Sequence, residues 1–194
     1  HDVQMYILAI KSLYRRLTHG KLVAICDGVS EQGRELIRQH VGPVRFLDLH
    51  TMDSGACQRG GTWERLVYIM KNTESEYTIQ MDADVLCVGD IPEVLDAIAR
   101  NRSFTLSDGE GLPKQPLANW ASASRQSNDI AIAFEKRAAE YPDATSFSYV
   151  RGSSGFAGFA RGGQDLDFLE TFHRNGVALM GDRWTEWGTE QVAS

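Results

Sequence analysis

Cysteine is scarce in this chain, and so are proline and long apolar runs. The 194 residues include three cysteines, Cys26, Cys57 and Cys87, with no close Cys-x-x-Cys pair. An odd number at these spacings argues against a disulfide framework and against a zinc knuckle, and it favours a reducing compartment. With 5 prolines and 42% apolar residues, the composition excludes collagen-like and intrinsically disordered classes.

Blocks of basic residues are also missing. The chain carries 20 Lys and Arg against 26 Asp and Glu, and the resulting net charge of -6 is spread along the sequence. No stretch approaches the roughly 18 apolar residues of a membrane span, and the first residues lack the basic-then-apolar order of a signal peptide. We therefore expect a soluble, cytoplasmic protein with no membrane span, whose partners are small molecules or metal-bridged anions and not nucleic acid.

Hydrophobic periodicity predicts alternating helices and strands within one domain. Apolar residues recur at helical spacing from residue 3 to residue 17, ahead of Gly20. We expect strands at residues 22–26, 44–49, 77–81 and 104–107, and further helices at 30–42, 63–70, 93–100, 129–141 and 165–174. This α/β alternation predicts a mostly parallel sheet with helices on both faces.

Two segments are rich in glycine and polar residues. Residues 109–128 indicate a long loop or lid. Residues 149–159 combine aromatics with three glycines, which indicates backbone close to a ligand or to a neighbouring strand. The chain begins with a helix, whereas an open α/β sheet normally begins with a strand. We expect a single domain over residues 1–194 that lacks the first strand of its sheet and is truncated at one or both ends.

Two Asp-x-Asp motifs occur in different settings. Asp165-Leu166-Asp167 opens a predicted helix, where acidic side chains cap free amides and complement the helix dipole. Asp82-Ala83-Asp84 ends the apolar strand at 77–81. On extended backbone, residues two apart point the same way, so both carboxylates would face the carboxyl edge of the sheet, where α/β proteins bind ligands.

Asp82 and Asp84 are therefore the candidate metal ligands. Two carboxylates placed close together repel each other unless a cation or a hydrogen-bond donor lies between them. Hard oxygen ligands suit Mn²⁺ or Mg²⁺, which bind substrate phosphates beside one or two carboxylates. The motif predicts such a cation and a diphosphate-bearing substrate. The alternative is that the pair caps the turn at Ile91-Pro92 or pairs with an arginine.

Together with other motifs, this one resembles the GT-A-fold glycosyltransferases of the bacterial and family-eight types. The resemblance is carried, in chain order, by Asp27-Gly28, Arg65-Leu66, Asp82-Ala83-Asp84, Ser153-Ser154-Gly155-Phe156 and Glu190-Gln191. It covers nearly the whole chain and implies a three-layer GT-A-like fold. It also implies metal-dependent transfer of a sugar from a nucleotide-diphosphate donor, first of all a UDP-sugar, to a hydroxyl of a glycan or glycoconjugate acceptor.

The resemblance assigns donor-binding roles to several residues. Asp27 would contact the nucleotide base, Arg65 would reach the sugar or phosphate side of the donor, and Asp108 would hold donor-sugar hydroxyls. Each has a structural alternative. Asp27 would otherwise be a turn residue, Arg65 an ion-pair partner of Asp82 or Asp84, and Asp108 a solvated turn.

The remaining assignments lie late in the chain. Ser153, Ser154 and Gly155 stand where the family has an Asn-Ala-Gly or Asn-Ser-Gly turn that lines the sugar pocket. Glu190 and Gln191 resemble the Asp-Gln pair beside the reacting sugar carbon and are the candidate catalytic residues. Serine thus replaces asparagine, and glutamate replaces the shorter aspartate. The sequence leaves open whether transfer inverts or retains the anomeric centre.

Nearby aromatic residues and the histidines complete the candidates. Trp184 and Trp187 would either stack on a sugar face or pack against the final helix. Family-eight enzymes take a further histidine ligand from beyond the Asp-Gln pair, and here three residues follow Gln191. We expect the four histidines between the terminus and that pair to lie at helix ends, strand ends or the surface: His19, His40, His50 and His173.

Two other functions stay open at this point. A nucleotidyltransferase on a related scaffold would need an early glycine-rich loop with basic residues, and Gly60-Gly61 is too short for it. A non-catalytic carbohydrate-binding remnant of the fold is favoured by the missing first strand and opposed by the intact Asp82 and Asp84.

Overall fold

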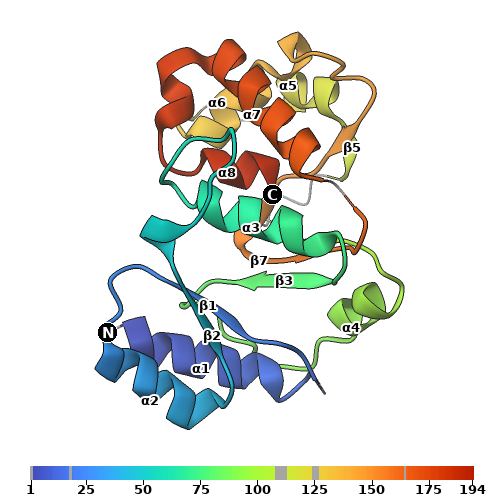
Figure 1. The fold of residues 1–194 in the computed structure, drawn as a ribbon. Coiled ribbons are helices and arrows are strands. Elements are labelled where there is room, and N and C mark those ends of the chain that lie inside the picture. The colour runs from blue at the N-terminus through green and yellow to red at the C-terminus, as the bar shows by residue number, and fades with distance from the viewer. Residues whose placement is uncertain (1, 18, 108–112, 124–126, 164) are drawn as a thin grey trace.

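The computed structural model describes residues 2–17, 19–107, 113–123, 127–163 and 165–194, which form a mixed α/β fold (Figure 1). Its helices are α1 (Asp2–Tyr14), α2 (Glu31–Val41), α3 (Trp63–Thr73), α4 (Pro92–Ala99), α5 (Trp120–Ala123), α6 (Ile130–Lys136), α7 (Leu166–Met180) and α8 (Thr189–Ala193). Its strands are β1 (Val23–Cys26), β2 (Arg45–Asp48), β3 (Thr78–Met81), β4 (Phe104–Ser107), β5 (Gln115–Pro116), β6 (Ser148–Tyr149) and β7 (Gly152–Phe159).

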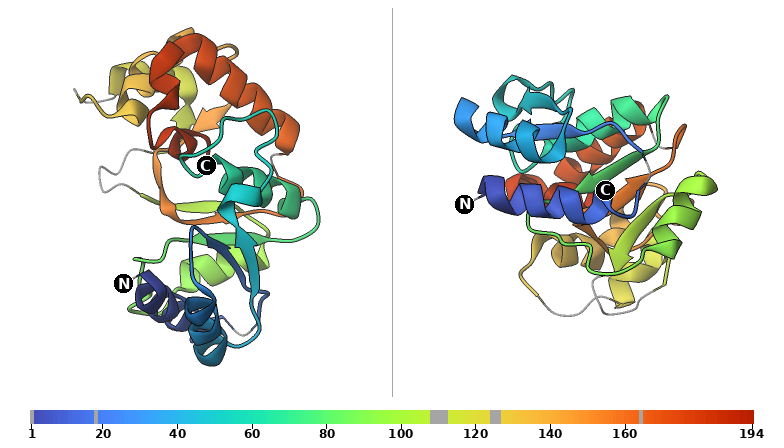
Figure 2. Two further views of the ribbon diagram at one scale, coloured as in Figure 1. Left: turned by 60° about the vertical axis from the view of Figure 1, so that its left-hand side comes forward. Right: turned by 90° about the horizontal axis from the view of Figure 1, so that it is seen from below.

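Strands β1 to β4 and β7 lie between two groups of helices. Figure 2 shows α1 and α2 at one end of the molecule and the later helices, α5 to α8, at the other. α3 lies between β3 and the later helices and packs against α7. Within the described ranges, no helix has the length and apolar character needed to cross a membrane.

The sheets are small, and most of their pairings are antiparallel. β1 and β2 run parallel to each other, whereas β7 lies between β3 and β4 and runs antiparallel to both. β3 and β4 therefore point the same way across α4, as the β-α-β order predicts. The expected mostly parallel sheet does not form among the described strands, because β7 returns from late in the chain and separates β3 from β4.

Glycines make this insertion possible. A Cβ at Gly152 would collide with the side chain of Thr105, and a Cβ at Gly158 would collide with the ring of Phe104. The glycines of this segment thus serve close approach to a neighbouring strand, which was one of the two expectations from the sequence. The register between β4 and β7 shifts between Thr105 and Leu106, so the strands are locally irregular.

The main hydrophobic core lies among α3, α6, α7 and α8. Trp63, Phe134 and Trp184 are fully buried there, and the rings of Phe134 and Trp184 lie 5.5 Å apart at a tilt. Aromatic pairs at this spacing add to the stability gained from burial of the rings. α8, which carries the predicted catalytic pair, is therefore fixed against a packed core through its buried Val192.

The segment expected to be a long loop or lid is partly core. Its described residues form β5, a 3-10 turn at Leu117–Asn119, and α5. Leu117 and Trp120 are fully buried, and the indole N–H of Trp120 donates to the carbonyl of Tyr149 at 3.2 Å. These two apolar anchors outweigh the polar composition around them, so the lid interpretation is wrong for this part of the segment.

Capping residues set the starts of two helices as expected. Ser30 accepts from the backbone N–H of Gly33 at the start of α2. Asp165 accepts from the N–H of Phe168 at 2.9 Å at the start of α7. The second Asp-x-Asp motif therefore supplies a helix cap, as predicted. α1 ends at Tyr14, one turn before the stripe of apolar residues does.

Candidate functional site

The Asp82-Ala83-Asp84 motif follows the last residue of β3. The N–H of Asp82 donates to the carbonyl of Gly155 in β7 at 2.8 Å, and the N–H of Val85 donates back to the carbonyl of Asp82 at 3.3 Å. Ala83 and Asp84 thus lie in a turn and not on extended backbone. The argument that alternation points both carboxylates the same way is therefore wrong. Asp82 is partly buried, whereas Asp84 is exposed.

Arg65 reaches this motif from α3. Its guanidinium donates to the carboxylate of Asp82, and its second terminal nitrogen lies 3.7 Å from Oε1 of Glu190. The Arg65 side chain is 18% exposed and that of Glu190 is 5% exposed, so the three charges interact in a partly desolvated place. The ion pair predicted as an alternative role for Arg65 is present, and it links two other predicted site residues.

Unpartnered polar atoms gather at the same place. Among the described residues, Nε of Arg65 and Oε2 of Glu190 are buried and have no hydrogen-bond partner. A buried polar group without a partner costs free energy, and such groups commonly mark sites that a ligand, ion or water completes. Arg65 and Glu190 therefore keep unused hydrogen-bonding capacity in this place.

β7 forms the adjoining wall. A Cβ on Gly155 would lie 3.6 Å from Oδ2 of Asp82, and the N–H of Gly155 donates to Oγ of Ser153 at 3.1 Å. Gln191 of α8 donates from its side-chain amide to the carbonyl of Gly152 at 2.9 Å. α8 is thereby tied to the strand that passes Asp82.

The neighbouring residues of β7 are held from both sides. The carbonyl of Ser154 accepts from the side-chain amide of Gln80 in β3, and the carbonyl of Ser153 accepts from Oγ1 of Thr105 in β4 at 3.3 Å. Ser153-Ser154-Gly155 thus lies in strand β7 and not in the turn that the resemblance implies, and its backbone has little freedom. Ser154 contributes through its carbonyl, and nothing in these contacts engages its hydroxyl.

Six of the predicted residues thus meet although they come from four distant segments of the chain. We call them the Arg65 cluster: Arg65, Asp82, Ser153, Gly155, Glu190 and Gln191. α3, β3, β7 and α8, which carry or flank these residues, lie together in the middle of the molecule (Figure 1).

Two predicted donor contacts lie elsewhere. Asp27 follows β1 and lies 3.0 Å from Nε2 of His50, and both side chains are more than two-thirds exposed. No contact described for it involves the Arg65 cluster, and His50 lies at the end of β2, as expected for that histidine. Asp108 is outside the described residues.

The two tryptophans near Glu190 differ completely. Trp184 is fully buried, and its indole N–H donates to Nδ1 of His173 at 3.2 Å. Burial, together with the nearby positive charge of Arg174, lowers the pKa of His173, so its ring is neutral and accepts this bond. Trp184 and His173 are core residues. Trp187, by contrast, is 80% exposed.

The loop that contains Gly60-Gly61, a pair too short to hold a triphosphate, supports the start of α3. Gly60, Gly61 and Thr62 all have positive φ angles of 86°, 58° and 69°. Oε1 of the buried Glu64 accepts from the N–H of Gly60 at 2.8 Å. A threonine with positive φ is strained, and such strain is stored where surrounding contacts hold it. The Gly-Gly pair before a helix was the one signal in the sequence.

The first residue of α8 anchors to the same end of α3. Oγ1 of Thr189 accepts from the indole N–H of Trp63 at 3.0 Å and from the amide of Gln58 at 3.3 Å. Glu190 is the next residue along the chain. Its position relative to Arg65 is therefore fixed by buried contacts and not by the ion pair alone.

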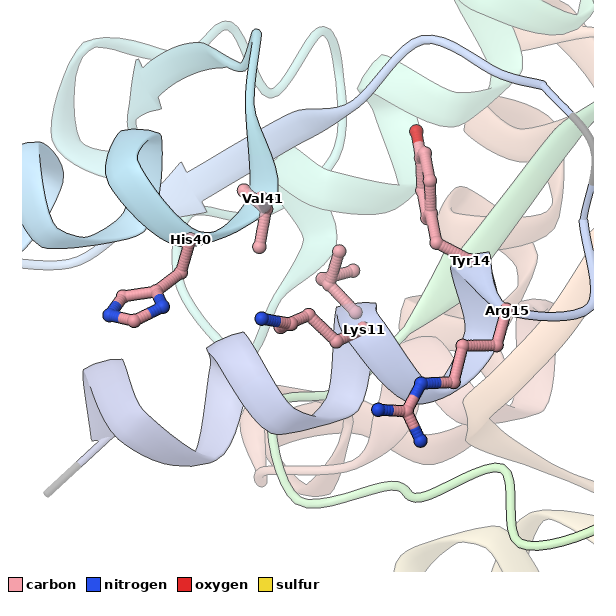
Figure 3. Close-up of a pocket in the computed structure, with 6 residues that line it drawn as sticks. Lys11, Tyr14, Arg15, His40 and Val41 are labelled. Carbon is pink, nitrogen blue, oxygen red and sulfur yellow. The ribbon is translucent and has the colours of Figure 1, made fainter.

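Two cavities lie away from the cluster. One of about 240 Å³ lies between α1 and the end of α2, where Lys11, Arg15 and His40 surround it (Figure 3). Lys11 and His40 belong to the last turns of their helices, where cations offset the negative end of the helix dipole. A second, of about 210 Å³, is lined by β2 and α3 residues such as Leu47 and Tyr68. Helix-end electrostatics accounts for the basic groups.

Asp82 of the cluster and the neighbouring Asp84 are the carboxylates that a cation bringing other ligands with it would use. Asp82 shares one oxygen with Arg65, and Asp84 is exposed. Over the residues that can be described, no three or more His, Cys, Asp or Glu side chains are arranged to hold a metal. Two carboxylates suit Mn²⁺ or Mg²⁺ whose remaining positions are filled by water and diphosphate oxygens, and not a closed protein cage.

Comparison of the chain with models of protein families, with curated proteins and with solved structures gave no match in any of the three. Function must therefore be inferred from the residues of the Arg65 cluster and from their geometry.

Proposed function

We propose that this chain is a metal-dependent glycosyltransferase of the GT-A type, which moves a sugar from a nucleotide-diphosphate donor to a hydroxyl of a glycan or glycoconjugate. One observation carries the proposal. Residues that the motif resemblance assigns to a single donor site come from α3, β3, β7 and α8, and their side chains and backbone meet in the Arg65 cluster. Four of the five motifs that carry the resemblance thus support the proposal, whereas Asp27-Gly28 lies elsewhere.

The charges of the cluster suit a diphosphate donor. Arg65 is a fixed, partly desolvated cation, and a guanidinium binds phosphate oxygens through parallel hydrogen bonds. Asp82 and Asp84 would hold Mn²⁺ or Mg²⁺ beside it. A cation bound there supplies the charge that stabilises a departing diphosphate, which is the electrostatic contribution that dominates many group transfers.

The sugar would lie against β7 and α8. Gly155 has no Cβ, which leaves room beside Oδ2 of Asp82. The unpartnered Oε2 of Glu190 is an acceptor for a sugar or acceptor hydroxyl, and as a base it would take the proton of that hydroxyl in an inverting reaction. Gln191 uses its amide N–H to hold α8 on β7, so its role is to position Glu190.

The three-layer GT-A architecture is part of the same proposal. β1 and β2 are parallel, and β3 and β4 point the same way across α4, as in one half of a doubly wound sheet. The Arg65 cluster follows the carboxyl end of β3, which is where such sheets bind ligands.

Nucleotide binding tests the proposal directly. The chain is titrated with UDP alone and with UDP plus Mn²⁺ by calorimetry, and nucleotide-sugar hydrolysis is screened with Mn²⁺. We expect Mn²⁺ to strengthen UDP binding by the wild type but not by the Asp84→Asn variant. Asp167→Asn is the matched control, because Asp167 is also exposed and belongs to the helix-capping Asp-x-Asp motif.

The possible outcomes separate the functions. An unchanged metal effect in Asp84→Asn would remove the metal from the proposal. Binding of sugars in a chain that binds no nucleotide, with or without Mn²⁺, would instead support the non-catalytic carbohydrate-binding protein. Turnover of nucleoside triphosphate with a sugar phosphate would support the nucleotidyltransferase.

A further inference from the structure

Trp187 is the exception among the tryptophans of this chain. Trp63, Trp120 and Trp184 have no exposed surface, whereas Trp187 is 80% exposed. Scattered surface apolar residues are ordinary, but an indole ring has the largest apolar surface of any side chain and is usually covered. Its exposure calls for an explanation from its surroundings.

The backbone on both sides of Trp187 is held in place. Before it, Arg183 forms two contacts with the carboxylate of Glu186, at 2.7 and 3.1 Å. After it, Gly188 adopts a φ of 96°, which favours glycine, and the side chain of Thr189 is anchored to α3. Trp187 is therefore displayed from a short, fixed segment, which lowers the entropy that a ligand must remove on binding.

This segment also carries Glu190. Three residues span at most about 11 Å, so the Cα atom of Trp187 lies within the length of one or two sugar rings of the Cα atom of Glu190. The carboxylate of Glu190 faces inward to Arg65, while the indole of Trp187 faces solvent. A ligand can thus cover the indole without displacing the buried contact between Glu190 and Arg65.

We infer that Trp187 is the stacking platform for a pyranose ring of the acceptor glycan. This inference rests on the proposed transferase function. The apolar C–H face of a pyranose matches the face of an indole, and the ring hydroxyls would meet the fixed carboxylate and guanidinium of Glu186 and Arg183. The acceptor is favoured over the donor because Arg65 and Asp82 already suit the diphosphate, and no contact described for either of them involves Trp187.

Tryptophan fluorescence provides a selective test, because only one of the four indoles is open to solvent. Acrylamide, a neutral quencher, reports mainly on Trp187. The full chain is titrated with maltose, cellobiose and lactose at millimolar concentrations, and separately with UDP in the presence of Mn²⁺. We expect at least one disaccharide to protect the exposed indole from quenching, whereas UDP gives no protection.

Variants identify the residue that is protected. Trp187→Ala should abolish both the quenchable emission and its protection. Trp187→Phe keeps a smaller aromatic face, so the dissociation constant of the protecting disaccharide, followed by calorimetry, should rise about three- to tenfold. Val177→Ala is the control, because Val177 is a half-exposed apolar residue of α7 and its loss should leave sugar binding unchanged.

Failure of this inference differs from failure of the proposed function. If none of the disaccharides protects Trp187 in a chain that binds UDP with Mn²⁺, the platform is overturned and the transferase stands. Protection by UDP alone would make Trp187 a nucleobase contact and would also overturn the inference. Protection by a disaccharide in a chain that binds no UDP would leave a sugar-stacking residue without the transferase.

Discussion

Arg65 of α3 and Asp82 at the end of β3 form an ion pair that also reaches Glu190 of α8. These three residues come from separate segments of the chain, and Gly155 of β7 lies beside the Asp82 carboxylate. The charges are not symmetric, because one guanidinium faces two carboxylates. The cluster therefore keeps an excess of negative charge that a further cation would offset.

Removal of the guanidinium should destabilise the fold. Arg65→Met keeps the apolar stem but leaves the Glu190 carboxylate buried without its cation, so the free energy of unfolding should fall by about 1–3 kcal/mol in a denaturant titration. Lys71→Met on the same helix is the matched control, because the partner of Lys71, Asp53, is exposed and that loss should be smaller. Equal losses in the two variants would mean that the Arg65 pair adds nothing through its burial.

Much of this arrangement could be predicted from local sequence signals. The starts of α2 and α7 follow from Ser30 and Asp165, since a cap depends only on neighbouring residues. The apolar runs gave β1, β2 and β3 within a residue or two. Asp82 was also among the stated ion-pair partners of Arg65, whereas its approach to Glu190 was not predicted.

Other features depend on contacts that the sequence does not encode locally. The insertion of β7 between β3 and β4 relies on close approach at Gly152 and Gly158, and the glycines alone do not show which strands they approach. The turn after Asp82 depends on bonds to Gly155 and from Val85, and periodicity cannot show them. Thr62 precedes α3 at a position where threonine is common, but its positive φ and the burial of Glu64 have no local sequence signal.

Alanine substitutions at two glycines of β7 should have different effects, one on folding and the other on ligand binding. Gly158→Ala places a Cβ against the ring of Phe104 and the hydroxyl of Tyr77, and should cost about 1–3 kcal/mol of stability. Gly155→Ala meets only Ser153 Oγ at 3.2 Å and more distant atoms, so it should fold with little loss. It fills the space beside Asp82, however, and should weaken UDP binding in Mn²⁺. Unimpaired binding by the folded Gly155→Ala chain would place the donor elsewhere.

The cysteines should differ in reactivity. Burial, with the nearby Glu170 charge, raises the pKa of the Cys57 thiol from 9.0 to about 12, whereas Cys87 is only partly buried. A disulfide reagent such as DTNB at pH 8 should therefore label Cys87 first in the native chain and all three thiols in guanidinium. Labelling of Cys57 at the rate of Cys87 would show that this part of the core opens readily.

The same shift predicts a pH dependence of stability. The pKa of the Cys57 thiol is higher in the folded chain than in the unfolded chain, so the protonated thiol contributes fully to stability below pH 9. This contribution is lost as the pH rises from about 9 toward 12. Wild type should lose more stability over that window than Cys57→Ala, as measured by denaturant titrations at a series of pH values. Parallel curves for the two chains would contradict the assigned burial of the thiol.

His173 should lower the stability of the fold in acid, whereas Cys57 lowers it in alkali. Burial and Arg174 hold the pKa of His173 below its ordinary value of 6.5, and the neutral ring accepts the indole N–H of Trp184. The unfolded chain takes up its proton near pH 6.5 while the folded chain resists it, so stability is full above that pH and falls as the pH drops below it. His173→Gln, which can still accept from Trp184, should show a weaker decline between pH 7 and pH 5 in denaturant titrations. If the variant and the wild type decline in parallel, other groups cause the acid sensitivity and the ring does not titrate between the two states.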